Sequence, residues 1–184
     1  TTNAAFLHFT SNETIQGVQY ETPPVVDDVP LVCDASSDFL SRPLNVSDYG
    51  MIYACAQKNA GPAGVTVIII RKDLLGRSPD PLPGYLNYRL HAEQDSLYNT
   101  PPTFAIYILD LVCQWLENEG GLSAMAARNA EKAGWLYSAI DGSDGFYTGH
   151  ADREHRSNMN VTFRLPSDDL QQQFLSQAAE RNMD

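Results

Sequence analysis

The sequence predicts an α/β protein: a mostly parallel sheet flanked by helices, followed by part of a smaller α+β domain. The apolar run at 65–70 is continuous, which is typical of a strand covered on both faces by helices. Residues 158–165 instead alternate between apolar and polar, which is typical of a half-buried antiparallel strand. This change in pattern predicts two domains, residues 1–122 and residues 123–184.

The first half of the chain is expected to contain further strands at 6–9, 31–34 and 50–54. Asp34 ends the second of these, so a carboxylate stands at the carboxyl end of a strand, the edge of an open α/β sheet where ligands bind. The polar segment at 10–17 is expected to form a turn whose hydroxyl and amide groups can present donors to an anion. The other connections are expected to be a short helix or turn at 36–42 and a loop at 78–94.

Helices are expected at 103–119 and 123–140, separated by glycines that are typical of a helix end. The first has an apolar stripe at helical spacing, made of Phe104, Ile108, Leu111, Val112 and Trp115. The second is expected to bury one face, made of Met125, Ala133, Leu136 and Ile140, and both tryptophans, Trp115 and Trp135, stand at core spacing. A last helix is expected after Ser167, which caps it ahead of two acidic residues.

The charge of the chain argues against some partners. Lys and Arg number 12 against 23 Asp and Glu, a formal net charge of −11, which disfavours nucleic acid and anionic membrane surfaces. No run of about 18 apolar residues suggests a membrane span, and the first residues do not resemble a signal peptide. Because the chain runs directly into a strand, we expect it to begin inside a larger fold.

The three cysteines, Cys33, Cys55 and Cys113, lie in apolar surroundings and lack the spacing of a metal site. We therefore expect buried thiols in a reducing cytoplasm and no metal. The four histidines, His8, His91, His150 and His155, are not spaced as metal ligands or as the base of a nucleophile. We expect none of them to have a direct catalytic role.

Lys58 stands in a loop of small residues, 53–64, directly before the apolar run. A lysine at the entrance to a buried strand is costly to desolvate, and a lowered pKa would make its amine a nucleophile able to form a Schiff base with a carbonyl. The alternative is a surface lysine in a glycine-rich turn. Asp34 lies 24 residues earlier on the preceding strand, since 58 − 34 = 24, so both side chains can reach one crevice.

An aspartate beside a pyridinium nitrogen and a Schiff-base lysine are the two groups that pyridoxal phosphate chemistry needs most. The opposite charge of the carboxylate favours the protonated ring nitrogen. Thr14 and the Asn99-Thr100 pair are further candidates for the same site. Many α/β proteins contain an Asp and a Lys so placed, so spacing alone does not decide the chemistry.

Five sequence motifs give a more specific indication of the chemistry than the spacing of Asp34 and Lys58. They are NETI at 12–15, DASSDFLSRP at 34–43, YACAQKN at 53–59, SLYNTPP at 96–102 and RSNMN at 156–160. Together they resemble the phosphoserine aminotransferases, class-V aminotransferases of pyridoxal phosphate fold-type I, in order and over essentially the whole chain. The resemblance implies the C-terminal part of a large cofactor-binding domain followed by the first part of a small domain.

The resemblance also implies roles for individual residues. Lys58 would form the Schiff base and move the proton during transamination, and Asp34 would partner the ring nitrogen. Thr14 and Gln57 would contact the cofactor, and Gln57, Asn99 and Thr100 would be associated with its phosphate. Because Asn99 and Thr100 would reach the cofactor of a neighbouring subunit, the resemblance implies a homodimer.

The implied reaction moves an amino group from glutamate to 3-phosphohydroxypyruvate in serine biosynthesis, giving O-phosphoserine and 2-oxoglutarate, with a related step in pyridoxine biosynthesis. The alternatives are another class-V activity, such as a cysteine desulfurase-like one, or a non-catalytic fragment.

The chain departs from the family pattern in two ways. Cys55 occupies a position where the family motif has glycine, and the family's earlier half, with its phosphate cradle and ring-stacking aromatic, is missing, as is the segment beyond residue 184. We therefore expect the isolated chain to be inactive.

Overall fold

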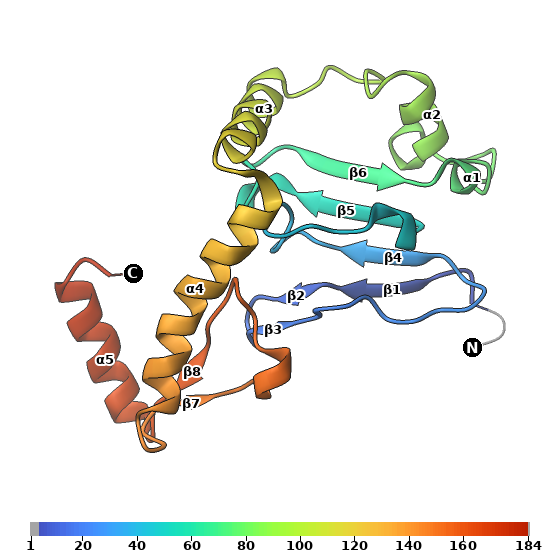
Figure 1. Cartoon of the computed structure of the whole chain (residues 1–184). Helices are drawn as coiled ribbons and strands as arrows, with labels where there is room; N and C mark the ends of the chain where they lie inside the picture. Colours follow the sequence, from blue (N-terminus) through green and yellow to red (C-terminus); the bar gives the residue numbers. More distant parts are fainter. Residues whose placement is uncertain (1–3, 184) are drawn as a thin grey trace. The chain divides into compact units, whose positions relative to one another are not determined.

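Residues 4–183 are described by the computed structural model and are traced in Figure 1. They divide into two units, which are described separately below. The first takes residues 4–11 and 22–126, and the second takes residues 12–21 and 127–183. The assignment of residues 12–21 to the second unit has no signal in the sequence. The domain boundary after residue 122 stays a prediction.

A four-stranded sheet in the order β1-β4-β5-β6 organises the first unit (Figure 1). Its strands are β1 (Leu7–Thr10), β4 (Leu31–Asp34), β5 (Met51–Cys55) and β6 (Thr66–Ile70). The β1–β4 and β4–β5 pairs are parallel, whereas β5 and β6 are antiparallel. The predicted strands are therefore all present, in a mixed sheet with two parallel pairs.

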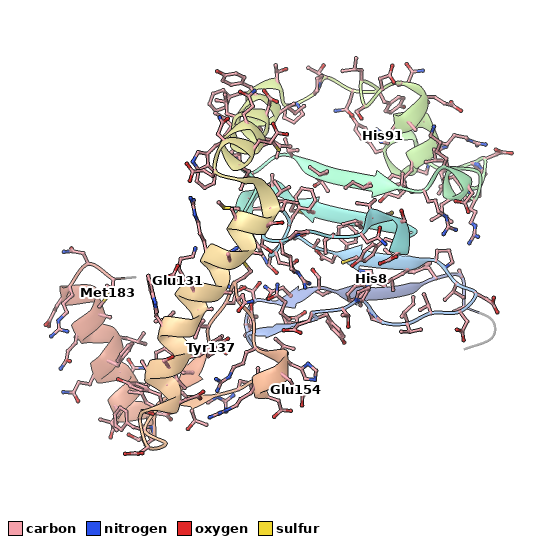
Figure 2. All side chains as sticks on the ribbon, viewed as in Figure 1. His8, His91, Glu131, Tyr137, Glu154 and Met183 are labelled. Atoms are coloured by element: carbon pink, nitrogen blue, oxygen red, sulfur yellow. The ribbon has the colours of Figure 1, made fainter. Side chains whose placement is uncertain are left out.

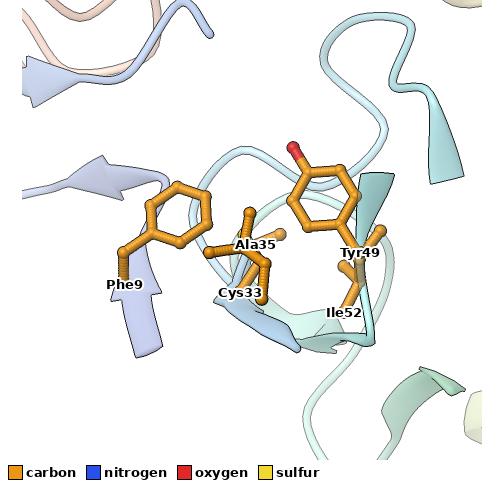
Figure 3. Packing of buried hydrophobic residues seen from close by; sticks show 6 residues of the cluster. Phe9, Cys33, Ala35, Tyr49 and Ile52 are labelled. Carbon is orange, nitrogen blue, oxygen red and sulfur yellow. The ribbon is translucent and has the colours of Figure 1, made fainter. Parts of the chain in front are cut away.

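Alternate residues of the strands give this sheet one packed face. Phe9, Leu31, Cys33 and Ile52 point into a core that also holds Ala35 and Tyr49 (Figure 3). Phe9 and Tyr49 stack there with ring centroids 6.4 Å apart. Because side chains alternate along a strand, the neighbouring residues His8, Val32, Asp34, Met51 and Tyr53 share the opposite face.

The β6 strand is not covered on both faces, contrary to the prediction from its continuous apolar run. It lies at the edge of the sheet with β5 as its only strand partner in the described residues, and Ile68 is 37% exposed. Ile68 and Ile70 line a cavity of about 460 Å³. A continuous apolar run shows that both faces of a strand can be buried. It does not show whether other elements cover both faces.

The connection after β6 contains more helix than expected. Short helical segments stand at α1 (Lys72–Leu75), η3 (Gly84–Leu86) and α2 (Tyr88–Glu93), so the predicted loop at 78–94 is wrong over part of its length. The Asn87 side chain starts α2 by accepting hydrogen bonds from the backbone N–H groups of Arg89 and Leu90. This N-cap stands among turn-forming residues, and α2 is too short for an apolar period to reveal it. Elsewhere, η1 occupies Val46–Asp48, and residues 36–42 form turns.

The two long helices lie where they were predicted, at α3 (Thr103–Asn118) and α4 (Gly121–Asp141). Their buried sides are narrower than expected. Met125, Ala133 and Ile140 are buried as predicted, but Leu136, Trp115 and Trp135 are exposed, at 55%, 50% and 66% respectively. Helical spacing identifies which residues share a face, but burial of that face requires a neighbour. Among residues 4–183, no helix is both long and apolar enough to cross a membrane.

The second unit contains short antiparallel pairs, β2 (Asn12–Glu13) with β3 (Val18–Gln19) and β7 (Thr148–Gly149) with β8 (Phe163–Arg164), then η4 (Arg153–His155) and α5 (Asp168–Glu180). The strand predicted at 158–165 is wrong except for β8. The backbone N–H groups of Met159 and Asn160 donate to Ser157 Oγ instead of to a neighbouring strand. Ser167 caps α5 as predicted, with its Oγ accepting from the Leu170 N–H at 3.3 Å.

Candidate functional site

Asp34 ends β4 and therefore lies at the carboxyl edge of the parallel strands, as predicted. In the register of the sheet it stands between Thr10 on β1 and Tyr53 on β5. Its Oδ1 accepts a hydrogen bond from the Ser36 N–H at 2.9 Å, so the turn that follows the strand fixes the carboxylate. The side chain is half-buried and keeps an accessible side.

The loop that carries Lys58 is held by buried alanines. Ala54, Ala56 and Ala60 have no exposed surface, whereas Gln57 and Lys58, in η2 (Ala56–Lys58), face outward. The Ala56 N–H donates to the Val65 carbonyl and the Ala60 N–H donates to the Ala56 carbonyl. Small side chains are needed at these three positions because each is enclosed by its own neighbours.

Two hydrogen bonds join the lysine loop to the turn after Asp34. The Cys55 N–H donates to Ser36 Oγ at 3.1 Å, and Asn59 Nδ2 donates to the Phe39 carbonyl at 2.7 Å. Since β4 and β5 are parallel, Asp34 and the lysine loop stand at the same edge of the sheet, as predicted. Lys58 itself is exposed, as in the alternative of a surface lysine in a glycine-rich turn. The reason is that β6, the strand it precedes, is an edge strand.

A buried polar network supports the same edge from the core side. Ser11 Oγ donates to the Asp38 carboxylate and to the Asp34 carbonyl, the latter at 3.2 Å. Arg42 lies 3.7 Å from Asp38, whose side chain is only 4% exposed. The charged residues of the 34–43 motif therefore anchor the turn after Asp34. The sequence motif alone did not indicate this structural role.

The remaining predicted site residues occur in different parts of the chain. Asn99 lines the 460 Å³ cavity beside β6, together with Gly64, Thr66 and His91. Its Nδ2 donates to the carbonyl of Thr100, which is exposed. Thr14 belongs to the second unit and is half-buried there. The predicted roles of Thr14, Asn99 and Thr100 therefore stay predictions.

The structure adds two residues that the sequence analysis did not select. Tyr53 stands beside Asp34 in the sheet register, and its hydroxyl lies 3.0 Å from Nε2 of His8 on β1. Burial, followed by the charge of Asp34 and a hydrogen bond to it, raises the pKa of the Tyr53 phenol. His8 was expected to have no direct catalytic role, and only the alternation along β1 and β5 hints that these side chains share a face.

Comparison with known protein families identifies the family of this chain. The family model described as aminotransferase class-V matches residues 1–180. The chain belongs to the class-V aminotransferase family.

Several class-V relatives carry a more specific name. Phosphoserine aminotransferase of Rhodopirellula baltica is 57% identical over 183 residues, which are 98% of this chain and 49% of that protein. A solved structure on radiation damage of the Schiff base in phosphoserine aminotransferase superposes with a TM-score of 0.97 at 53% identity, over 100% of this chain and 51% of that one. The pyridoxal phosphate-bound phosphoserine aminotransferase of Trichomonas vaginalis superposes with a TM-score of 0.91 at 42% identity, over 97% and 51% of the two chains.

These class-V relatives confirm the predicted fold class. The chain spans about half the length of the relatives it matches.

Proposed function

We propose that this chain is part of a phosphoserine aminotransferase, which transfers the amino group of glutamate to 3-phosphohydroxypyruvate and forms O-phosphoserine and 2-oxoglutarate. The observation that carries the proposal is the 57% identity to a protein of that name over 98% of this chain. A placement in L-serine biosynthesis, with the related step of pyridoxine biosynthesis, belongs to the same proposal.

The side chains at the sheet edge fit pyridoxal phosphate as the cofactor. When bound, this cofactor supplies a ring that withdraws electrons from the α-carbon of the substrate. Asp34 presents an oriented carboxylate, the partner that a protonated ring nitrogen needs. Lys58 presents a primary amine on a loop that two hydrogen bonds tie to the Asp34 turn. An amine so placed would hold the cofactor at its carbonyl carbon, with the carbonyl oxygen leaving as water, and would carry a proton at Nζ.

The other predicted contacts complete the proposal. Gln57, beside Lys58, and Thr14 would donate hydrogen bonds to the cofactor, and Asn99 and Thr100 would bind its phosphate in a neighbouring subunit, so the working enzyme would be a homodimer. We place the enzyme in the cytoplasm, where free thiols such as Cys33, Cys55 and Cys113 persist. We further propose that activity requires the half of the relatives that this chain does not match.

The test of Lys58 uses a full-length protein that contains this chain, saturated with pyridoxal phosphate. Reduction with borohydride, followed by peptide mass spectrometry, should place the cofactor covalently on the peptide that carries Lys58. The Lys58→Ala variant should lose this adduct and reduce kcat by at least about a thousandfold, because it lacks the amine that holds the cofactor and moves the proton.

Lys72→Ala provides the matched control, since Lys72 is an exposed lysine of α1. It should keep the adduct and the activity. A cofactor adduct on another lysine, or one that persists in Lys58→Ala, would refute the assignment.

A further inference from the structure

The turn that carries Thr14 has little apolar packing of its own. It occupies residues 14–17, between the short strands β2 and β3 of the second unit. Ile15 in this turn is 88% exposed, and Gln16 is exposed as well. Since hydrophobic stabilisation scales with the apolar area removed from water, these side chains contribute little to holding the turn. Polar contacts must therefore fix its position.

Ser157 supplies several of these contacts, because each of its polar groups is hydrogen-bonded. Its N–H donates to the Gly17 carbonyl at 2.9 Å, and its carbonyl accepts from the hydroxyl of Tyr137 at 2.8 Å, which Figure 2 labels on α4. Its Oγ donates to Asn12 Oδ1 and accepts from two backbone N–H groups of its own segment. A hydroxyl has one proton and two lone pairs, so this side chain, which is 0% exposed, is fully satisfied.

The turn is also fastened at its two ends. Asn12, only 1% exposed, accepts from Ser157 and donates from Nδ2 to Asn160 Oδ1 at 2.7 Å. At the other end, Thr162 Oγ1 donates to the Gln16 carbonyl at 2.9 Å. A buried amide or hydroxyl that loses its partner is costly, so these contacts favour a single position of the turn.

Two of the sequence motifs meet in this cluster, the one at 12–15 and the one at 156–160. Asn12 and Ser157 are 145 residues apart in the chain. Thr14 itself is half-buried and stands two residues after Asn12. Because a hydrogen bond weakens steeply when its donor is misaligned, a hydroxyl on a loose turn would bind a ligand poorly.

We propose that Asn12, Ser157 and Thr162 are positioning residues, which fix the turn at 14–17 and thereby hold Thr14 in place to bind the cofactor. The role rests on the proposed function, which assigns Thr14 to the cofactor. The anchoring of the turn is a property of this chain alone. A purely structural role would lower stability without acting through Thr14.

The first experiment needs no cofactor. Hydrogen exchange of the cofactor-free full-length protein, read by mass spectrometry of the peptide that spans the turn, should be about tenfold faster in Ser157→Ala, because Asn12 loses its buried donor. Ser143→Ala is the matched control. The Ser143 hydroxyl, in the same unit, donates to the Ile140 carbonyl at 2.6 Å and accepts from the Tyr147 N–H at 2.9 Å. Exchange of this peptide at one rate in all three proteins would overturn the anchoring.

The second experiment asks whether the anchor acts through Thr14. In the full-length protein, Thr14→Val should raise the dissociation constant of pyridoxal phosphate about tenfold, as for loss of one hydrogen bond, and Ser157→Ala should raise it by up to the same factor. The double variant should bind no more weakly than Thr14→Val alone, because residues that act as a unit are not additive. An effect of about a hundredfold in the double variant, or unchanged binding in Ser157→Ala, would refute the positioning role.

Thr162 provides a milder test, which holds even if Ser157→Ala does not fold. Thr162→Val removes the donor to the Gln16 carbonyl and should weaken cofactor binding about threefold. Thr162→Ser keeps the hydroxyl and should bind as wild type. Equal losses in the two variants would count against the proposal, because the hydrogen bond would then be irrelevant.

Failure of the proposed function has a different signature. If the wild-type protein forms no lysine adduct with the cofactor, the proposed function fails and the positioning role falls with it, although faster exchange in Ser157→Ala would still show the anchored turn. If the adduct forms and Thr14→Val weakens binding while Ser157→Ala and Thr162→Val do not, the cofactor assignment stands and only the positioning role is wrong.

Discussion

At the scale of single residues, the three thiols differ in their surroundings. Burial raises the pKa of the Cys33 thiol to about 12, a hydrogen bond from Ser11 opposes this, and the charge of Asp38 adds to it. Cys113 is half-buried, and burial followed by the charges of Asp110 and Glu117 raises its pKa as well. The expectation of buried thiols is therefore confirmed for Cys33 and wrong for Cys55 and Cys113, which are half-buried.

A labelling experiment follows from these differences. Because the thiolate is the reactive form, a raised pKa means that the nucleophile appears only as the pH rises toward that value. At pH 8, iodoacetamide should alkylate Cys113 slowly and leave Cys33 unmodified in the folded protein, and peptide mass spectrometry reads both sites. In concentrated urea all the thiols should react. Alkylation of Cys33 as fast as Cys113 in the folded state would contradict the burial.

Asp34 and the lysine loop could be found from the sequence because their signals are local. An apolar run that ends in Asp places a carboxylate at a strand end, and small residues around Lys58 mark a tight loop. The contact between His8 and Tyr53 could not be found in this way. It depends on which strands pair and in which register, and pairing is decided by contacts between distant segments. The sequence separation of His8 and Tyr53 carries no trace of the 3.0 Å contact.

At the scale of elements, Gly17 joins the β2–β3 turn to the segment that follows Arg156. Its φ is +66°, a conformation that favours glycine, and a Cβ would stand 2.6 Å from Thr162 Oγ1 and 2.7 Å from the Asn160 carbonyl. Its own carbonyl accepts from the Ser157 N–H at 2.9 Å. The turn and the segment at 157–162 therefore approach as closely as backbone allows within the second unit.

Gly17→Ala should lower the free energy of unfolding by about 3 kcal/mol, because left-handed strain and a steric clash act together. The shift of the urea midpoint at constant m-value measures it. Gly134→Ala is the control, since Gly134 lies in α4 with nothing within 4 Å of its added Cβ. That change should raise stability by up to about 1 kcal/mol. Equal midpoints for the two variants would contradict the close approach.

The long helices could be predicted because their periods and end signals extend over many residues, whereas the strand at 158–165 could not be predicted correctly. Its alternation is genuine, but the Ser157 hydroxyl competes for the N–H groups of Met159 and Asn160. Serine side chains commonly compete with the backbone in this way. The alternation thus identified an extended segment but not its hydrogen-bond partners.

At the scale of the whole molecule, the described residues expose several large apolar side chains. Phe104 and Trp115 on α3 are 73% and 50% exposed, and Ile68 on β6 is 37% exposed. These residues belong to stretches that the sequence analysis expected to be buried. An apolar pattern identifies residues that can be buried, but burial also requires a covering surface, and exposed apolar patches often mark interaction sites.

The isolated chain, mixed with pyridoxal phosphate and both substrates, should show no measurable transamination. A full-length protein should convert 3-phosphohydroxypyruvate at least about a hundredfold faster than the keto acid without phosphate, since a site built for a charged group discriminates strongly against its loss. Coupled assay of 2-oxoglutarate formation measures both. Equal rates for the two keto acids would favour another class-V activity. Activity in the isolated chain would contradict the proposed requirement for the half of the relatives that this chain does not match.

The lysine loop is also the connection between the antiparallel strands β5 and β6, where Cys55 pairs with Thr66. The strand pairs β1–β4 and β4–β5 join residues further apart in the chain, such as Leu7 with Leu31. Closing a loop of about ten residues takes on the order of 10–100 ns, so this pairing should form early during folding. Doubling its length would cost only about 0.6 kcal/mol in closure entropy. Folding therefore places little constraint on the length of this loop, so its length can be set by the position that the proposed function requires of Lys58.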